Sequence, residues 1–415
     1  MRSLFTLLVI SFFISIQLVN AQPDTAWTRV YGGSGYDLGK CVRQTSDKCF
    51  VIVGTIDAYY DYIKDSTKYF QSKLFLAKID TNGNKIWEKY FSEYNIGYNA
   101  VSVEQTNDGG FIITGDIYSK TPGYKAAVLI KTDGNGVEIW RKQFETQGSV
   151  KACKETYDGG YIFLVSTFLA KLNSTGDVIW QKSYFGNFIE PTNDNGFIIL
   201  DTHLISARQG VKNLYKIDKD GNVIWTKALS SYIPVIGYLS ISSFKITDDN
   251  GYVFTGIASG SYFSGMYPFL LKTDSEINLS WIRYYIEGSG KDVIQSIDGS
   301  FIFAEFSTWS ILEKISSNGE VIWSFALEPP ETYEGCSVQE THDGGYIVLG
   351  NIVKTPGYEY DIILIRCKPY NDSLFDITYP KGGEVWMANS KPKITWKNHK
   401  KGTFVNIDFS ISSGL

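Results

Sequence analysis

A short segment that begins with an Asp- and Gly-rich turn and continues into an apolar strand recurs seven times along this chain. Asp, Asn and Gly allow the positive φ angles of tight hairpin turns at low steric cost. The apolar run after each turn is too short for a helix and is rich in β-branched and aromatic residues. Seven hairpins of one design indicate a repeat protein. The copies are DKCFVIVG at 47–54, DGGFIITG at 108–115, DGGYIFLV at 158–165, DNGFIIL at 194–200, DNGYVFTG at 249–256, DGSFIFAE at 298–305 and DGGYIVLG at 343–350.

A tryptophan accompanies every unit, placed after a second apolar strand and a second tight turn, as in AVLIKTDGNGVEIW at 127–140. Successive tryptophans are 60, 53, 40, 45, 56 and 42 residues apart. Units of this size with several short strands match propeller blades, whereas leucine-rich, ankyrin and tetratricopeptide units are shorter or helical. The structural tryptophans are Trp27, Trp87, Trp140, Trp180, Trp225, Trp281 and Trp323.

Each unit divides into four strands, and tight turns join the first strand to the second and the third to the fourth. Strands joined by such short turns must be antiparallel neighbours, so each Trp strand completes the blade that precedes it. Trp27 has no preceding strand, and the strand at 361–367 has no Trp after it. We therefore predict an all-β, seven-bladed propeller over residues 22–368, in which the N-terminal strand completes the last blade and closes the ring.

The best-matched repeats are WTRVYGGSGYD at 27–37, QTNDGGFIITG at 105–115 and ETHDGGYIVLG at 340–350. They resemble the β-propeller repeats of secreted bacterial proteins, and the strand–turn–Trp element resembles quinoprotein-type propellers. The resemblance covers about residues 24–368 and implies the fold. It does not imply an activity, because such repeats occur in binding proteins, scaffolds and enzymes.

The two ends of the chain differ from the repeats. Residues 1–21 have one basic residue, an apolar run and a small-x-small ending, which predicts a signal peptide; a membrane anchor is the alternative. We expect no membrane span after its removal, and a secreted or cell-surface protein. Residues 369–415 contain PKGGEVW and ITW, and resemble the start of an immunoglobulin-like module that is incomplete here. A short docked extension is the alternative.

Composition and charge exclude some classes of partner. The net charge is −5, and acidic and basic residues are interspersed without the basic patch that nucleic-acid binding needs. We expect no nucleic-acid partner and a monomer.

Sites for chemistry are weakly indicated. Cys41 and Cys49 flank the first turn at nearly mirror positions, so either a cross-hairpin disulfide or free half-buried thiols would fit. Oxygens alternate in 80–84 and 218–222, but ordinary hairpin turns explain them better than calcium loops. GSGKD at 288–292 lacks the rest of a phosphate-binding loop. We predict no catalytic residues, no metal site and no cofactor.

Long, Tyr-rich connections join strands two and three in several units, and antiparallel geometry places them on the same end of the ring as the blade-to-blade connections. Function often lies in loops on a rigid scaffold, and Tyr provides contact area with a polar tip. The alternative is that these rings only pack among neighbouring loops. The predicted ligand-binding residues are Tyr59, Tyr60, Tyr62, Tyr124, Tyr262, Tyr267, Tyr358 and Tyr360.

The leading functional hypothesis is an exported, non-enzymatic binding or surface-interaction protein with a glycan or protein ligand. One alternative is an enzyme on a propeller scaffold: a hydrolase or lyase acting on extracellular polysaccharide, or a quinone-dependent dehydrogenase. Another is a structural component of the cell surface.

Overall fold

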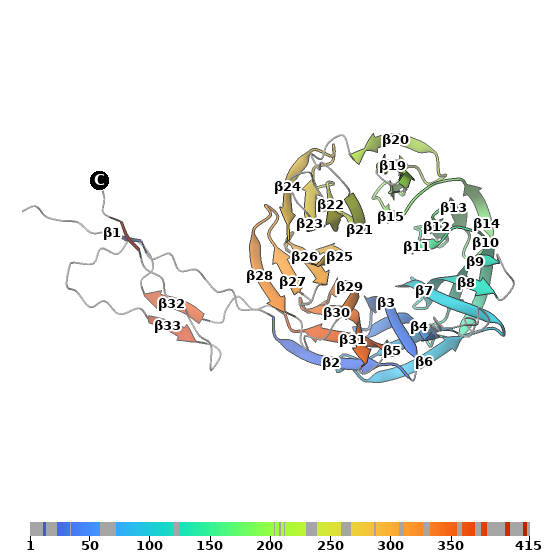
Figure 1. Cartoon of the computed structure of the whole chain (residues 1–415), viewed down its shortest axis with the longest axis horizontal. Helices are drawn as coiled ribbons and strands as arrows, with labels where there is room; N and C mark the ends of the chain where they lie inside the picture. Colours follow the sequence, from blue (N-terminus) through green and yellow to red (C-terminus); the bar gives the residue numbers. More distant parts are fainter. Residues whose placement is uncertain are drawn as a thin grey trace, which may run out of the picture. The chain divides into compact units, whose positions relative to one another are not determined.

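The computed structural model describes residues 11–13, 23–33, 35–58, 72–119, 124–202, 204–206, 209–210, 212–229, 239–258, 267–285, 288–306, 311–326, 333–354, 359–369, 375–379, 395–398 and 410–412. The chain divides into two units, Thr25–Lys368 and a second unit formed by both ends of the chain. The first unit consists of seven four-stranded antiparallel sheets arranged as blades around a centre (Figure 1). The predicted seven-bladed, all-β propeller is confirmed.

The blades follow one another along the chain. Blade 1 contains β3 (Tyr36–Gln44), β4 (Phe50–Ala58), β5 (Lys73–Ile79) and β6 (Lys85–Phe91); blade 2 contains β7 (Ile96–Gln105), β8 (Phe111–Ser119), β9 (Lys125–Thr132) and β10 (Glu138–Glu145). Blade 3 contains β11 (Val150–Glu155), β12 (Tyr161–Val165), β13 (Phe168–Leu172) and β14 (Val178–Lys182); blade 4 contains β15 (Phe188–Pro191), β16 (Phe197–Asp201), β19 (Asn213–Ile217) and β20 (Val223–Ala228).

The remaining blades repeat this order. Blade 5 contains β21 (Leu239–Ile246), β22 (Tyr252–Ala258), β23 (Tyr267–Thr273) and β24 (Leu279–Tyr284); blade 6 contains β25 (Ser289–Gln295), β26 (Phe301–Phe306), β27 (Ile311–Ile315) and β28 (Val321–Ala326). Blade 7 contains β29 (Tyr333–Glu340), β30 (Tyr346–Lys354), β31 (Glu359–Cys367) and β2 (Thr25–Tyr31). A small extra hairpin, β17 (Leu204–Ser206) with β18 (Gln209–Gly210), extends blade 4 between its second and third strands.

The N-terminal strand closes the ring as predicted. Strand β2 pairs antiparallel with β31, with Trp27 opposite Arg366 and Tyr31 opposite Ile362. Blade 7 is thus a composite of both ends of the propeller, and in Figure 1 the blue β2 lies beside the orange β31. The pairing joins the last blade to the first segment of the chain, so the ring has no open edge between its ends.

The first strand of each blade lies nearest the centre, and the Trp strand lies at the rim (Figure 1). Every Trp strand has a register shift at the residue before its Trp, for example between Glu138 and Trp140. Such a bulge bends an edge strand and interrupts its ladder, which protects it from pairing with another chain. The outer edges are therefore poor templates for aggregation.

The core lies between neighbouring blades: each contact buries one face of each of two sheets, so a blade with a neighbour on either side is buried on both faces. Between blades 1 and 2, for example, Val51, Val53 and Leu76 pack with Val103 and Ile113 in one buried cluster. Strands buried on both faces read as continuous apolar runs without alternation, and this explains the uniform composition of the second strand in each unit.

The second unit includes two short strand pairs among its described residues. Strand β1 (Ser11–Phe13) pairs with β34 (Ser410–Ser412), and β32 (Phe375–Tyr379) pairs with β33 (Thr395–Asn398). Most of the predicted signal peptide and of the predicted immunoglobulin-like module lies outside the described residues, so both remain predictions. In the part of the chain that is described, no helix reaches the length and apolarity needed to cross a bilayer.

Candidate functional site

The turn between the first and second strands has the same internal structure in six blades, and in blade 6 the Ser296 hydroxyl donates a hydrogen bond to Glu340 instead of the turn aspartate. In blade 2, the hydroxyl of Thr106 and the backbone N–H of Gly110 both donate hydrogen bonds to Asp108 Oδ1. A cation from the third strand, Lys131, lies 2.8 Å from Asp108 Oδ2. We name the end of the propeller that carries these turns the turn face, and the opposite end the loop face.

This ion pair between turn and third strand recurs with nitrogen–oxygen distances of 2.5–2.8 Å. The cation is largely buried and the aspartate is about half exposed, so each pair fastens a turn to the blade beneath it. The pairs are Lys78–Asp47, Lys131–Asp108, Lys171–Asp158, Lys216–Asp194, Lys272–Asp249, Lys314–Asp298 and Arg366–Asp343.

The tryptophans join each blade to the next. The indole of Trp87 packs edge-on against Phe111 at the start of the second strand of the next blade, with ring centroids 6.0 Å apart. A Cβ added to Gly136 would lie 2.8 Å from the same indole, so the turn of the next blade closes tightly over it. Five junctions show this ring contact, at 5.6–6.2 Å: Trp27–Phe50, Trp87–Phe111, Trp140–Tyr161, Trp281–Phe301 and Trp323–Tyr346.

A hydrogen bond reinforces the same five junctions. The turn between the first and second strands begins with a Thr or Ser, and at these junctions the residue before it is Gln or Glu. The side-chain oxygen of this Gln or Glu accepts a hydrogen bond from a backbone N–H of the preceding blade. The donor is the residue that follows the turn Thr or Ser of that blade. We name this bond the latch. The donor–acceptor distances are 2.8–2.9 Å. The pairs, with the donor first, are Ser46–Gln105, Asn107–Glu155, Asp248–Gln295, Ile297–Glu340 and His342–Gln44.

Blade 4 lacks the latch on both sides. The acceptor position is Pro191 at the junction of blades 3 and 4 and Ile246 at the junction of blades 4 and 5, and neither side chain can accept a hydrogen bond. Within the described residues, neither Trp180 nor Trp225 makes the ring contact that the other five tryptophans make. The two junctions of blade 4 therefore lack both of these contacts, although buried apolar clusters still span them.

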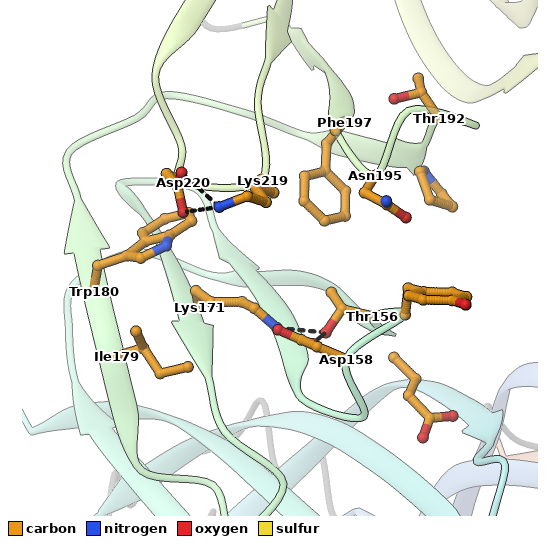
Figure 2. A pocket seen from close by; sticks show the side chains of 14 residues that line it. Thr156, Asp158, Lys171, Ile179, Trp180, Thr192, Asn195, Phe197, Lys219 and Asp220 are labelled. Atoms are coloured by element: carbon orange, nitrogen blue, oxygen red, sulfur yellow. Dashed lines mark hydrogen bonds and ion pairs between the residues drawn. The ribbon is translucent and has the colours of Figure 1, made fainter.

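A pocket of about 330 Å³ lies at the first of these junctions, on the turn face (Figure 2). We name it the blade 3/4 groove. Its walls come from the turns of both blades and from β14, and Figure 2 shows the rings of Trp180 and Phe197 and the ion pairs Lys171–Asp158 and Lys219–Asp220 around it. The lining residues are Glu155, Thr156, Tyr157, Asp158, Lys171, Ile179, Trp180, Pro191, Thr192, Asn195, Gly196, Phe197, Lys219 and Asp220.

The groove combines exposed aromatic surface with polar groups. Tyr157 is 93% exposed at its rim, whereas Phe197 is 4% exposed and forms a buried wall. The ammonium of Lys182 lies 5.4 Å from the ring centroid of Trp180, a cation–π arrangement that holds the indole in place. Partial burial acts to raise the pKa of Asp158, but hydrogen bonds from Lys171 and Thr156 outweigh it and hold that pKa at about 2. The carboxylate is therefore charged at neutral pH.

A second pocket, of about 420 Å³, lies on the turn face between blades 5 and 7. Its lining includes Gln295 and Glu340, whose side chains are engaged in latches with blades 5 and 6. The Gln295 carboxamide and the Glu340 carboxylate are thus already hydrogen-bonded within the propeller.

Each innermost strand of blades 1 to 5 carries one charged side chain of a ring around the centre, and the sign alternates from one blade to the next. Glu104 accepts hydrogen bonds from Arg43 and Lys154, and Lys245 forms an ion pair with Glu190. Burial acts to raise the pKa of Glu104, but Arg43 and Lys154 lower it far below its usual range. Each carboxylate in this ring is paired with a cation of a neighbouring blade, and these ion pairs link the innermost strands.

The predicted ligand-binding tyrosines of the loop face are only partly described. Tyr124 is half-buried and packs against the core between blades 1 and 2. Tyr360 is half-buried, with its ring centroid 5.8 Å from that of Tyr36, and Tyr267 is half-buried at the start of β23. Tyr124 and Tyr360 thus contact neighbouring segments, and ligand binding by these tyrosines stays a prediction. Tyr59, Tyr60, Tyr62, Tyr262 and Tyr358 lie outside the described residues.

The predicted disulfide between Cys41 and Cys49 is not formed, and both thiols are free. The residue opposite Cys41 in the ladder is Val53, whereas Cys49 lies in the turn, where its carbonyl accepts the N–H of Thr45. Of the two possibilities left open by the nearly mirror positions, the register favours free thiols, because Cys41 is four residues further from the turn than the residue opposite Cys49.

The other candidate sites have structural explanations. Asp218 accepts the backbone N–H groups of Asp220 and Asn222 within one hairpin turn, as expected for turn chemistry rather than calcium binding. Residues 289–295 form strand β25, which rules out a phosphate-binding loop at 288–292. No group of three or more His, Cys, Asp or Glu side chains in the described part of the chain is arranged to hold a metal ion.

Two carboxylates lie close together inside blade 6. Burial, followed by repulsion from Glu313, raises the pKa of Glu305 to about 7. Burial also raises the pKa of Glu313. Glu305 is 3% exposed and Glu313 is 9% exposed, so a substrate in solution does not reach either carboxyl group in this conformation. The pair is a source of pH-dependent stability.

Neither the groove nor Tyr157 and Pro191 was anticipated from the sequence. A signal was present: in the seven aligned repeats, the residue before the turn Thr or Ser is Gln or Glu five times, and Pro191 and Ile246 are the exceptions. The sequence alone does not explain these exceptions. Only the folded ring shows that the side chain at this position reaches the turn of the preceding blade.

Comparison with known proteins agrees with this architecture. The family model described as "Outer membrane protein assembly factor BamB" matches residues 125–261, from the third strand of blade 2 into blade 5. No curated protein has a significant match to this chain.

Solved structures that match this chain share little sequence with it. The Pan2 WD40 domain of Neurospora crassa is 10% identical, with a TM-score of 0.55, covering 84% of this chain and 96% of its own. YCF48 bound to D1 peptide is 10% identical, with a TM-score of 0.52, covering 85% and 99%. BamB from Moraxella catarrhalis is 9% identical, with a TM-score of 0.38, covering 81% and 100%. The chain is a seven-bladed β-propeller repeat protein in which a central segment is similar to the BamB family model.

Proposed function

We propose that this chain is an exported, non-enzymatic binding protein, and that the blade 3/4 groove is its ligand site. The observation behind this proposal is that two independent inter-blade contacts, the latch and the tryptophan ring contact, are both missing where the groove lies. The pocket at this junction is lined by aromatic and polar groups. A pocket of about 330 Å³ is at the lower end of the usual range for ligand sites and fits one side chain or one sugar ring.

We favour a peptide as the ligand. The groove has a frame of turns, the exposed ring of Tyr157, the half-buried indole of Trp180 and several polar groups, which is the usual composition of a protein–protein hot spot. YCF48, a structure of the same fold, was solved with a peptide bound. A glycan would use the same aromatic surface for stacking and is the alternative ligand.

Peptide-binding measurements on single variants test this proposal. Heptapeptides selected from a random display library against the intact protein are the probes, and their affinities are measured by titration. Tyr157→Ala should weaken binding at least tenfold, whereas its stability should change by about 0.5 kcal/mol or less because the side chain is exposed. A glycan array with the same variant examines the sugar alternative.

Tyr94 provides the matched control. It is 89% exposed and lies in the connection between blades 1 and 2, on the loop face. Tyr94→Ala should leave peptide binding unchanged. If binding is lost in Tyr94→Ala and kept in Tyr157→Ala, the ligand binds the loop face and the assignment of the groove is wrong.

A further inference from the structure

We infer that the blade 3/4 groove takes a primary carboxamide, presented by a glutamine side chain of a peptide, whose oxygen accepts the hydrogen bond of the Tyr157 N–H. This inference rests on the proposed peptide-binding function and adds the chemical group that the groove selects. In this way the ligand supplies, from outside, the latch that blade 4 lacks.

The five intact latches define what the vacant position accepts. At each of them the N–H after the turn Thr or Ser binds a side-chain oxygen at 2.8–2.9 Å, and the acceptor is Gln three times and Glu twice. At blade 3 the equivalent donor is the Tyr157 N–H, and within the described residues it has no acceptor. The position that would supply the acceptor is Pro191, whose ring is at the rim of the groove.

The charges of the groove favour an amide over a carboxylate. Its ionisable groups are Glu155, Asp158, Lys171, Lys219 and Asp220, which sum to one negative charge. Both cations are already engaged: Lys171 Nζ lies 2.6 Å from Asp158 Oδ1, and Lys219 Nζ lies 2.8 Å from Asp220 Oδ2. A ligand carboxylate would meet net repulsion there, whereas the NH₂ of a carboxamide can donate to the neighbouring acidic oxygens.

The walls of the groove suit the stem of the side chain. At the five intact junctions the indole contacts the aromatic ring of the next blade, but the rings of Trp180 and Phe197 are not in such contact. The pocket includes both rings together with Ile179 and Pro191. Methylene groups of a glutamine placed among these apolar surfaces would be removed from water, which favours binding.

The amide signal of Tyr157 reports the interaction directly. In protein labelled with ¹⁵N-tyrosine, titration with N-acetylglutamine methylamide should shift the Tyr157 signal saturably. N-acetylglutamate methylamide should shift it at a higher midpoint concentration, and N-acetylleucine methylamide should leave it unchanged. An equal response to the glutamine and leucine probes would overturn the inference.

Substitution of Pro191 provides the decisive pair of variants. Pro191→Gln places the missing acceptor in the chain itself, so the Tyr157 signal should sit at its bound position without probe and should no longer respond to it. Pro191→Ala removes the proline without adding an acceptor and should keep the response. If Pro191→Gln still responds as the unsubstituted protein does, no internal latch competes with the probe and the inference is wrong.

These results separate the inference from the proposed function. If the selected peptides lose affinity with Tyr157→Ala but contain no recurrent glutamine and bind Pro191→Gln normally, the groove is a ligand site and only the glutamine inference fails. If Tyr157→Ala has no effect on any selected peptide, the proposed function fails with it.

Discussion

The ammonium of Lys131 lies 2.8 Å from Asp108 Oδ2, and only 4% of the lysine side chain is exposed, against 58% for the aspartate. Lys131 also donates to the carbonyl of Thr132 at 2.8 Å, so two of its three protons are held within blade 2. The same arrangement of a buried cation beneath an aspartate turn occurs in every blade, which makes it the most regular polar feature of the propeller.

Removing the aspartate should destabilise the fold more than removing the lysine. Asp108→Ala leaves the cation of Lys131 buried without its counter-ion and frees two donors of the turn, so the free energy of unfolding should fall by about 1–3 kcal/mol. Lys131→Met replaces the buried cation by an apolar side chain of similar length and should cost less than about 1 kcal/mol. Urea unfolding measures both variants.

The exposed pair Lys219–Asp220 is the control for these substitutions, since its side chains are 71% and 59% exposed. Lys219→Ala should leave the free energy of unfolding nearly unchanged. An equal cost for Asp108→Ala and Lys131→Met would show that burial of the cation does not govern the energy of this motif.

Acid should unfold the propeller between about pH 4 and pH 2. Partial burial acts to raise the pKa of Asp108, but the hydrogen bonds from Lys131 and Thr106 outweigh it and bring the pKa to about 2; hydrogen bonds from Lys216 and Thr192 do the same for Asp194. A carboxyl with a lowered pKa in the folded state contributes stability that is present above its unfolded pKa of about 4 and is lost as pH falls.

Thermal unfolding at a series of pH values measures this effect. The unfolding midpoint should fall steadily below about pH 4, because the unfolded chain binds more protons than the folded chain in this range. Lys131→Met should show a shallower fall, since the carboxyl of Asp108 then loses its charged partner. A midpoint that is constant from pH 4 to pH 2 would contradict the assignment of these ion pairs as stabilising.

Trp27 should be essential to the closed ring. Its indole packs 6.2 Å from the ring of Phe50 in blade 1 and donates to the carbonyl of Thr81 at 2.8 Å. Trp27→Ala should cost about 2–4 kcal/mol, somewhat less than a fully buried Trp because the side chain is half-buried. Deletion of residues 25–31 should destabilise all blades, because it opens the ring.

Val30 lies on the same strand as Trp27 and is 52% exposed, so Val30→Ala is the control and should change stability by about 0.5 kcal/mol or less. Urea unfolding followed by both fluorescence and circular dichroism distinguishes the outcomes. If Trp27→Ala unfolds one blade in a separate early transition, closure does not support the propeller as a whole.

Glu305 should make the protein less stable as pH rises through neutrality. Burial, followed by repulsion from Glu313, raises its pKa to about 7, above the unfolded value of about 4.5. The contribution is therefore fully present below about pH 4.5 and is lost as pH rises towards 7. Glu305→Gln cannot ionise, so its unfolding midpoint should vary less than that of the unsubstituted protein between pH 5 and pH 8; parallel curves would contradict the raised pKa.

The sequence by itself determined the blade count, the order of strands and the closure of the ring. The signals are local: a turn such as that at Asp108 and Gly109 forces two flanking strands to pair, and its repetition sets the period. The repeat pattern leaves Trp27 without a preceding strand and β31 without a following Trp. The two strands therefore had to pair, so even this long-range contact followed from the repeat pattern.

The tertiary structure decided where side chains from different blades meet. Cys41 and Cys49 appeared to face each other across a turn, but the real register places Val53 opposite Cys41. Tyr157 and Pro191 are far apart in sequence, and only the packing of blade 3 against blade 4 brings them to one groove. Backbone pairing within a blade is fixed by short turns and strand periodicity, whereas contacts between blades depend on the twist and spacing of whole sheets, which no local pattern specifies.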